Sequence, residues 1–213
     1  MFLFLFLFFF FFTGTSYRLP VQYGKTYLLR LVNAVMNEEM FFGIAKHNIT
    51  VVAQDGAYIK PITTSYIMIT PGQTMDILLT ANQAASYYYI AATPFFDPSI
   101  STTPFDSSNT SAILQYTGTY TPPTSIPYPT LPNVTDEDAA DNFTTRIRSL
   151  ASAAHPANVP QNITTRIVIT VAVNEILCPN ASCGGPSGNR ISASLNNISF
   201  VTPSTDILQA YYR

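Results

Sequence analysis

The sequence predicts an all-β protein built as a sandwich or a barrel. From residue 17 onward, short runs rich in Val, Ile, Leu, Tyr and Phe alternate with turn residues, at the spacing of roughly 8–12 residues expected of such folds. None of these early runs keeps a helical period over its length. Apolar residues make up 47% of the 213-residue chain, which is ample for a buried core.

The strands follow from β-branched and aromatic enrichment. In residues 75–81, Met75, Ile77 and Leu79 alternate with the other side chains, which is the period that turns one face of a strand toward a core. The tyrosine triplet at residues 87–89 alternates in the same way, so only two of its rings share a face. Strands are expected at residues 27–35, 40–45, 49–54, 65–70, 75–81, 87–92 and 112–116.

Turn residues separate these strands. Glycine-containing turns at residues 24–26 and 71–74 precede two of them, and residues 46–48 are interpreted as a hairpin connection.

The chain changes character after residue 120. Residues 121–141 combine prolines with an acidic cluster, which predicts an exposed connection because proline cannot donate to a sheet ladder. One short surface helix is expected over residues 142–154, where apolar side chains recur at helical spacing. Strands return at residues 165–173, and residues 191–195 with 198–201 form a hairpin. These strands either complete the sandwich or reach toward a neighbouring domain.

Residues 1–16 are an apolar leader and are left out of the fold. Its run at residues 2–12 is too short to cross a bilayer but has the length of a signal-peptide core, although no positive charge precedes it. The segment is a signal peptide, a mistranslated upstream segment or a membrane anchor. Apart from it, we expect no contact with membranes.

Charge excludes one class of partner. Only 10% of the residues are charged and the net charge is −2, so the sequence has no basic stripe that would neutralise a nucleic-acid backbone. No nucleic-acid partner is expected.

Glycosylation sequons predict a secreted, extracellular protein. Half of the 14 asparagines lie in Asn-x-Ser/Thr sequons. Cys178 and Cys183 fit the same oxidising compartment if they close a small disulfide loop, and free thiols are the alternative. The sequon asparagines are Asn48, Asn109, Asn133, Asn142, Asn162, Asn180 and Asn197.

Metal-binding side chains are scarce. A blue-copper site needs two imidazoles and a thiolate close together, yet the chain has only His47, His155 and the two distant cysteines. We expect His47 to be a turn histidine bonded to backbone and His155 to be solvated at a helix end. No metal site is therefore expected in this chain.

A set of motifs, taken in order, links the chain to a known family. Together they resemble plant laccases, which are blue multicopper oxidases. The likeness runs from residue 17 to residue 213 and covers the second of that family's three cupredoxin domains and the start of the segment leading to the third. The motifs are GKTYLLRLVNA at 24–34, NEEMFF at 37–42, IAKHNITVV at 44–52, YIKP at 58–61, PGQTMDILLTA at 71–81, ATPFF at 92–96, NFT at 142–144 and SLNNISFV at 194–201.

The resemblance implies a fold and a domain plan. The fold is a cupredoxin-like Greek-key β-sandwich with a Pro-rich linker and one short helix. Residues 17–120 form the domain core, residues 121–141 the connection, and residues 142–213 a helix and strands that complete the domain and lead toward a third one.

The resemblance also implies a function. Laccases oxidise phenols such as monolignols and reduce oxygen to water. They hold copper through His-x-His and His-Cys-His motifs of their first and third domains, and neither motif occurs here. This chain would thus have no cofactor of its own, would supply scaffold and part of a pocket, and would be inactive alone. The alternative is a secreted, metal-free cupredoxin-like glycoprotein that serves as a binding or structural module of the cell wall.

Two residues carry the implied pocket. By register with the family, Asn37 hydrogen-bonds the phenol, whereas an acidic residue there would also take its proton. Phe96 falls where the family has an apolar wall, and its ring would pack on an aromatic substrate. The alternatives are a turn residue for Asn37 and a packing residue for Phe96.

Overall fold

The computed structural model of this chain describes residues 2–7, 16–97 and 107–212. The chain divides into two units, Met1–Pro156 and Ala157–Arg213, and each is described by itself.

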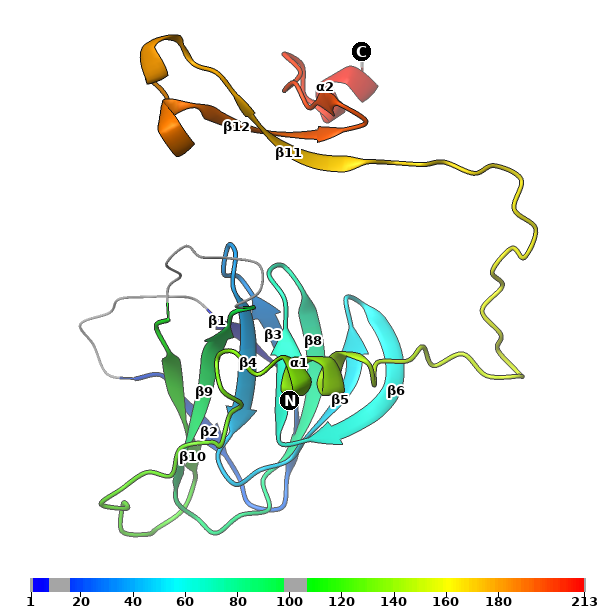
Figure 1. The fold of residues 1–213 in the computed structure, drawn as a ribbon. Helices are drawn as coiled ribbons and strands as arrows, with labels where there is room; N and C mark the ends of the chain where they lie inside the picture. The colour runs from blue at the N-terminus through cyan, green and yellow to red at the C-terminus, as the bar shows by residue number, and fades with distance from the viewer. Residues whose placement is uncertain (1, 8–15, 98–106, 213) are drawn as a thin grey trace. The chain divides into compact units, whose positions relative to one another are not determined.

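Two five-stranded sheets form the first unit (Figure 1). Sheet A has the strand order β1-β3-β8-β5-β6, and sheet B has the order β2-β10-β9-β4-β7. The predicted all-β sandwich is confirmed. The strands are β1 (Phe2–Leu7), β2 (Arg18–Val21), β3 (Thr26–Asn33), β4 (Glu39–Ile44), β5 (Ile49–Gln54), β6 (Ala57–Thr64), β7 (Tyr66–Ile69), β8 (Thr74–Thr80), β9 (Tyr87–Phe95) and β10 (Thr110–Tyr116).

Alternating side chains build the core between the sheets. In β8, Met75, Ile77 and Leu79 are fully buried while the side chains between them are partly exposed, as their spacing predicts. In β3, Leu29 and Leu31 occupy the equivalent inward positions. Each fully buried side chain of this size contributes about 1.5–3 kcal/mol, so this alternation fixes which face of each strand turns inward.

Three features of the first unit were missed or misplaced by the sequence analysis. β2 and β6 were not predicted. Residues 46–48 are not a hairpin, because the strands they connect, β4 and β5, lie in opposite sheets. Within the apolar leader, β1 pairs in parallel with β3 at one edge of sheet A.

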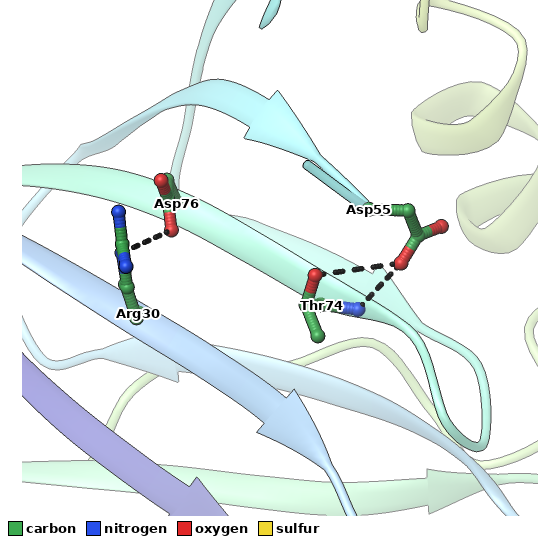
Figure 2. Close-up of polar contacts among 4 residues, drawn as sticks. All are labelled: Arg30, Asp55, Thr74 and Asp76. Carbon is green, nitrogen blue, oxygen red and sulfur yellow. Dashed lines mark hydrogen bonds and ion pairs between the residues drawn. The ribbon is translucent and has the colours of Figure 1, made fainter. Parts of the chain in front are cut away.

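The β5–β6 turn had a signal in the sequence. Asp55 and Gly56 have positive φ values of 47° and 78°, the geometry that makes Asp-Gly a favoured two-residue hairpin turn. Asp55 also accepts a hydrogen bond from the Thr74 backbone N–H at 2.8 Å (Figure 2). Beside it, Arg30 and Asp76 face each other across β3 and β8 with 3.3 Å between Nε and Oδ1. This cross-strand pair is partly exposed and contributes about 0.2–1 kcal/mol.

A Pro-rich segment covers the outer face of sheet B, and we call residues 127–134 the strap. The Tyr89 N–H donates to the Pro127 carbonyl at 3.0 Å, and the Phe96 N–H donates to the Val134 carbonyl at 2.6 Å. Pro127 and Val134 are seven residues apart, as are Tyr89 in β9 and Phe96 directly after it, so the strap runs along that strand.

Close packing of the strap depends on a glycine in β4. A Cβ on Gly43 would lie 2.9 Å from Leu131 Cδ2 and 3.6 Å from the Pro129 Cβ. Pro129 is buried. The prediction that residues 121–141 are an exposed connection is therefore wrong for the strap, which belongs to the packed unit.

The helix also lies earlier than predicted. α1 spans Glu137–Thr144, whereas residues 142–154 were expected to be helical. Asp136 is the N-cap and accepts from the Ala139 N–H at 2.9 Å, which satisfies one of the free donors of the first turn. Glu137 and Asp138 are exposed, as predicted for the acidic run, and they occupy the first helical turn, where the helix dipole favours negative charge. Phe143, 1% exposed, joins the core of the sandwich.

The segment after α1 covers an edge of sheet A. Ser149 forms a β-bridge with Ile59 in β6, and the Lys60 N–H donates to the Arg148 carbonyl at 2.9 Å. β6 is an edge strand, which explains how it accommodates Pro61.

The second unit holds a three-stranded sheet of its own. β11 (Val171–Ile176) pairs with β12 (Arg190–Leu195), which pairs with β13 (Ile198–Ser199). The strand predicted at residues 165–173 thus begins six residues later. The turn between β12 and β13 is formed by Asn196 and Asn197, both at positive φ, as the predicted hairpin requires.

Short helices complete the second unit. A disulfide joins Cys178 and Cys183 around the 3-10 turn η1 (Pro179–Ala181), which η2 (Pro186–Gly188) follows. α2 (Ile207–Tyr211) is a helix that the sequence analysis did not predict. Within the described residues, no helix is long and apolar enough to cross a membrane.

Candidate functional site

A buried asparagine shapes the loop that carries Asn37. Asn33 ends β3 at an inward position and is 0% exposed. Its amide nitrogen donates to the carbonyls of Glu38 at 3.0 Å and Ile69 at 2.9 Å, and its amide oxygen accepts from the Val35 N–H at 3.0 Å. The bonds to Glu38 and Val35 fix the β3–β4 loop, and the bond to Ile69 joins it to β7. The sequence analysis overlooked this residue, whose signal was a polar side chain in phase with the buried set of β3.

The structure brings the two predicted pocket residues to one end of sheet B. Asn37 is exposed in the β3–β4 loop, two residues before β4, and Phe96 directly follows β9 and is half-buried. In the antiparallel β4–β9 pair, Glu39 is opposite Phe95, so both loops leave the sheet at the same end. Phe96 is also held by its backbone bond to the strap at Val134.

This end of the sheet offers hydrogen bonding and an aromatic surface. The Asn37 amide both donates and accepts but cannot take up a proton at neutral pH. The Phe96 ring supplies a flat apolar face of the kind on which another aromatic ring packs. An amide of this kind hydrogen-bonds a hydroxyl group and a ring of this kind packs on another ring, whereas proton transfer needs a group from elsewhere.

His47 is buried and fully engaged. It is 3% exposed, and its Nδ1 lies 2.7 Å from the Ala45 carbonyl, which confirms the predicted bond to backbone. Because that carbonyl only accepts, Nδ1 carries the proton and Nε2 accepts from the Tyr116 hydroxyl at 2.8 Å. The same hydroxyl accepts from the Gln83 N–H at 3.0 Å. Burial lowers the pKa of His47 and outweighs the bond to Ala45, which raises it, so the imidazole is neutral at pH 7.

The donor set does not fit a copper centre. Both nitrogens of His47 have partners within the protein, and the two cysteine sulfurs are bonded to each other. His155 is exposed in a turn with Ser152, eleven residues beyond the end of α1 rather than beside it. Among the residues that the structure describes, no three His, Cys, Asp or Glu side chains gather as metal ligands would.

Tyrosines line both faces of β9, as the alternation predicts. Tyr88 is buried and its ring lies 5.0 Å from that of His47. Tyr87 and Tyr89 are half-buried on the opposite face, where the Tyr89 ring packs at 5.5 Å, tilted by 55°, against that of Tyr128 in the strap. Packing therefore accounts for all three rings.

A groove of about 720 Å³ lies at the other end of β4. Its floor includes Ile44 and His47, and its walls come from the strap, from the start of β7 and from the region around the start of α1. Neither Asn37 nor Phe96 lines it, so it is separate from the predicted pocket. Nothing in the sequence analysis pointed to it, because the strap was taken for an exposed segment.

Comparison with known proteins relates this chain to the multicopper oxidases and, among them, to plant laccases. The family model for multicopper oxidases matches residues 12–119. The chain is 46% identical to laccase-14 of Arabidopsis thaliana over 93% of this chain and 34% of that protein. It is 45% identical to putative laccase-1 of Oryza sativa subsp. japonica over 92% of this chain and 36% of that protein. The chain thus spans about a third of the length of these relatives.

Solved structures show the same likeness. The crystal structure of Fet3p, described as a multicopper oxidase that functions in iron import, matches 88% of this chain and 32% of its own with a TM-score of 0.60 and 26% identity. A laccase from B. aclada matches 87% of this chain and 30% of its own with a TM-score of 0.53 and 24% identity, which concerns the fold alone.

Proposed function

Because this chain belongs to the multicopper oxidase family, we propose that it acts as the middle domain of a laccase-type enzyme that oxidises phenols with reduction of oxygen to water. The fold is the cupredoxin-like Greek-key sandwich that the resemblance implied. The observation that carries the proposal is the placement of Asn37 and Phe96 at one end of sheet B, where the register with laccases puts a phenol pocket.

In this proposal the chain supplies binding and position. The Asn37 amide holds the phenolic oxygen, and Phe96 packs against the ring and keeps water away. Asn33 acts on the substrate only through Asn37, because its three hydrogen bonds fix the loop. Phenolic substrates such as monolignols are thus the proposed ligands.

Family membership is the only reason to associate copper with this chain. The side chains described here do not fit a copper site, so no copper-dependent step is derived from them. We place the copper ligands of the proposed enzyme outside this chain, which spans about a third of its relatives. The chain by itself is then expected to be inactive.

The sequons and the disulfide support a secreted protein of the apoplast. A disulfide between Cys178 and Cys183 is stable in an oxidising compartment. All seven sequon asparagines are exposed to solvent, as glycosylation requires.

Two measurements test the proposal. The purified chain, loaded with copper, is expected to show neither a stoichiometric blue centre nor oxygen uptake with a phenol. Turnover by the chain alone would contradict the domain role. The coding sequence on both sides is then read for in-frame His-x-His and His-Cys-His motifs. Their absence on both sides would instead favour a metal-free binding module.

If the flanks encode those motifs, the extended protein tests the pocket. Asn37→Ala is expected to raise KM for a phenol about tenfold, which corresponds to the loss of one hydrogen bond of about 1.4 kcal/mol. Asn37→Asp should raise kcat above the pKa of the new carboxyl group, since a carboxylate can accept the phenolic proton. Asn82→Ala, an exposed asparagine in the loop before β9, is the matched control. Unchanged kinetics in both Asn37 variants would remove Asn37 from the pocket.

A further inference from the structure

We propose that the groove between the strap and β7 holds the first sugars of an N-linked glycan attached to Asn48. The inference rests on the groove, on its lining and on the sequon at its rim. It requires passage through the secretory pathway but does not depend on the proposed oxidase function.

The groove has the size and the surfaces of a small-ligand site. Its volume of about 720 Å³ falls within the range of roughly 300–1,000 Å³ that such sites span. Flat apolar surfaces come from Tyr66, Tyr128 and the strap prolines Pro127, Pro129 and Pro132. Rings of this kind pack against the C–H face of a sugar, while the sugar's hydroxyl groups point to water or to polar neighbours.

The polar lining suits an uncharged ligand. Lys46 and Asp136 are one cation and one anion on the groove wall, so their charges balance. Asp136 is already bonded to the Ala139 N–H as the cap of α1. Ser65 and Thr130 add hydroxyl groups that both donate and accept. A neutral sugar with many hydroxyl groups matches this lining better than an ion does.

The sequon supplies the ligand covalently. Of the seven sequon asparagines, Asn48 is the one that lines this groove. Asn48 is exposed, and Thr50 two residues later completes the sequon. Attachment at the rim places the first sugars beside the groove without any cost of binding from solution, since tethering raises their effective concentration.

The attachment point is also rigid. His47, the neighbour of Asn48, is buried and bonded to Ala45 and Tyr116. Such a fixed base limits the directions that the glycan takes and so favours one packed position, because little freedom remains to be lost. Tyr128 is 49% exposed, so half of its surface is available to be covered by a sugar.

The test follows release of individual glycans from the folded protein. The full chain is secreted from a eukaryotic host behind a heterologous signal peptide, and peptide-N-glycosidase F is added without denaturant. Glycopeptide mass spectrometry then gives occupancy and release rate at each sequon. Asn162, which is exposed in a segment without strands, is the reference. We expect release at Asn48 to be about tenfold slower, as a covering contact of about 1.4 kcal/mol would give.

Variants of Tyr128 test whether the groove causes the slower release at Asn48. Tyr128→Ala should bring release at Asn48 to the rate at Asn162, whereas Tyr128→Phe keeps the ring and should keep the protection. Tyr58→Ala is the matched control, because Tyr58 is a 72% exposed tyrosine outside the groove. Circular dichroism verifies that each variant is folded. An unglycosylated Asn48, or equal release rates at Asn48 and Asn162 in the parent chain, would overturn the proposal.

Discussion

The imidazole Nε2 of His47 lies 2.8 Å from the hydroxyl of Tyr116, although 69 residues separate them in the chain. This bond ties the β4–β5 connection to the end of β10, and the Gln83 N–H joins it through the same hydroxyl. Two segments that cross between the sheets and one strand end are thereby held at a single buried point.

Acid should destabilise the first unit through His47. Burial lowers the pKa of His47 below its ordinary 6.5, so the unfolded chain binds this proton at a higher pH than the folded chain does. The free energy of unfolding is therefore unaffected by His47 well above pH 6.5 and falls as the pH drops below it. Urea denaturation between pH 8 and pH 5 measures this. His47→Gln should show a smaller loss over the same interval, and an identical pH profile in the variant would contradict the prediction.

Removing the Tyr116 hydroxyl should lower the free energy of unfolding more than removing the hydroxyl of a surface tyrosine does. Tyr116→Phe leaves both the His47 Nε2 and the Gln83 N–H without their partner. Unpaired buried groups cost about 1–3 kcal/mol in the free energy of unfolding. Tyr58→Phe, on an exposed ring, is the control and should change it by less than about 0.5 kcal/mol. Both values come from urea titration, and equal effects would argue that the bond contributes little.

Substitution of Asn33 should lower stability, whereas substitution of Asn37 should leave stability nearly unchanged. Asn33→Ala removes three hydrogen bonds at a fully buried position, so we expect a loss of about 2–4 kcal/mol. Asn37→Ala, in the exposed loop, should leave the thermal midpoint nearly unchanged. Calorimetry of the two variants checks this. A stable Asn33→Ala protein would show that the loop is held by other contacts.

Adding one methyl group at Gly43 should displace the strap and lower stability. Gly43→Ala places a Cβ 2.9 Å from both Leu131 Cδ2 and the Ser65 carbonyl oxygen, so one of them must move, and overpacking of this kind costs about 1–3 kcal/mol. Hydrogen exchange should then be faster at Tyr89 and Phe96, whose N–H groups bond the strap. Gly184→Ala meets nothing within 4 Å and is the neutral control. Unchanged exchange at both amides would mean that the strap tolerates the displacement.

Local patterns gave most of the strands. The runs that became β3, β5, β8 and β10 were predicted to within about two residues from their enrichment in β-branched and aromatic residues, and β8 also from its period of two. β4 was found from the same enrichment, although it has no period of two. Both of its faces are covered, so its residues 40–44 are buried without interruption.

Long-range contacts explain what the sequence could not give. The strap contains turn-forming prolines, and only its fit over Gly43 reveals that it is packed. Similarly, α1 starts at Glu137 because the preceding Asp136 caps the helix, a role that the neighbouring acidic residues obscure in the sequence. For the site, Asn37 and Phe96 came from likeness to a family, whereas Asn33 was missed because its role depends on carbonyls from two other segments.

The β-bridge between Ile59 and Ser149 can form only late in the synthesis of the chain. β6 leaves the ribosome some 90 residues before the segment that covers it, and until then its free backbone groups can pair with another nascent chain. A polypeptide that ends before Arg146 would keep every strand of the sandwich but would lack the segment that covers the edge of β6. Such a product should aggregate during expression, whereas one extended to Pro156 should remain in solution.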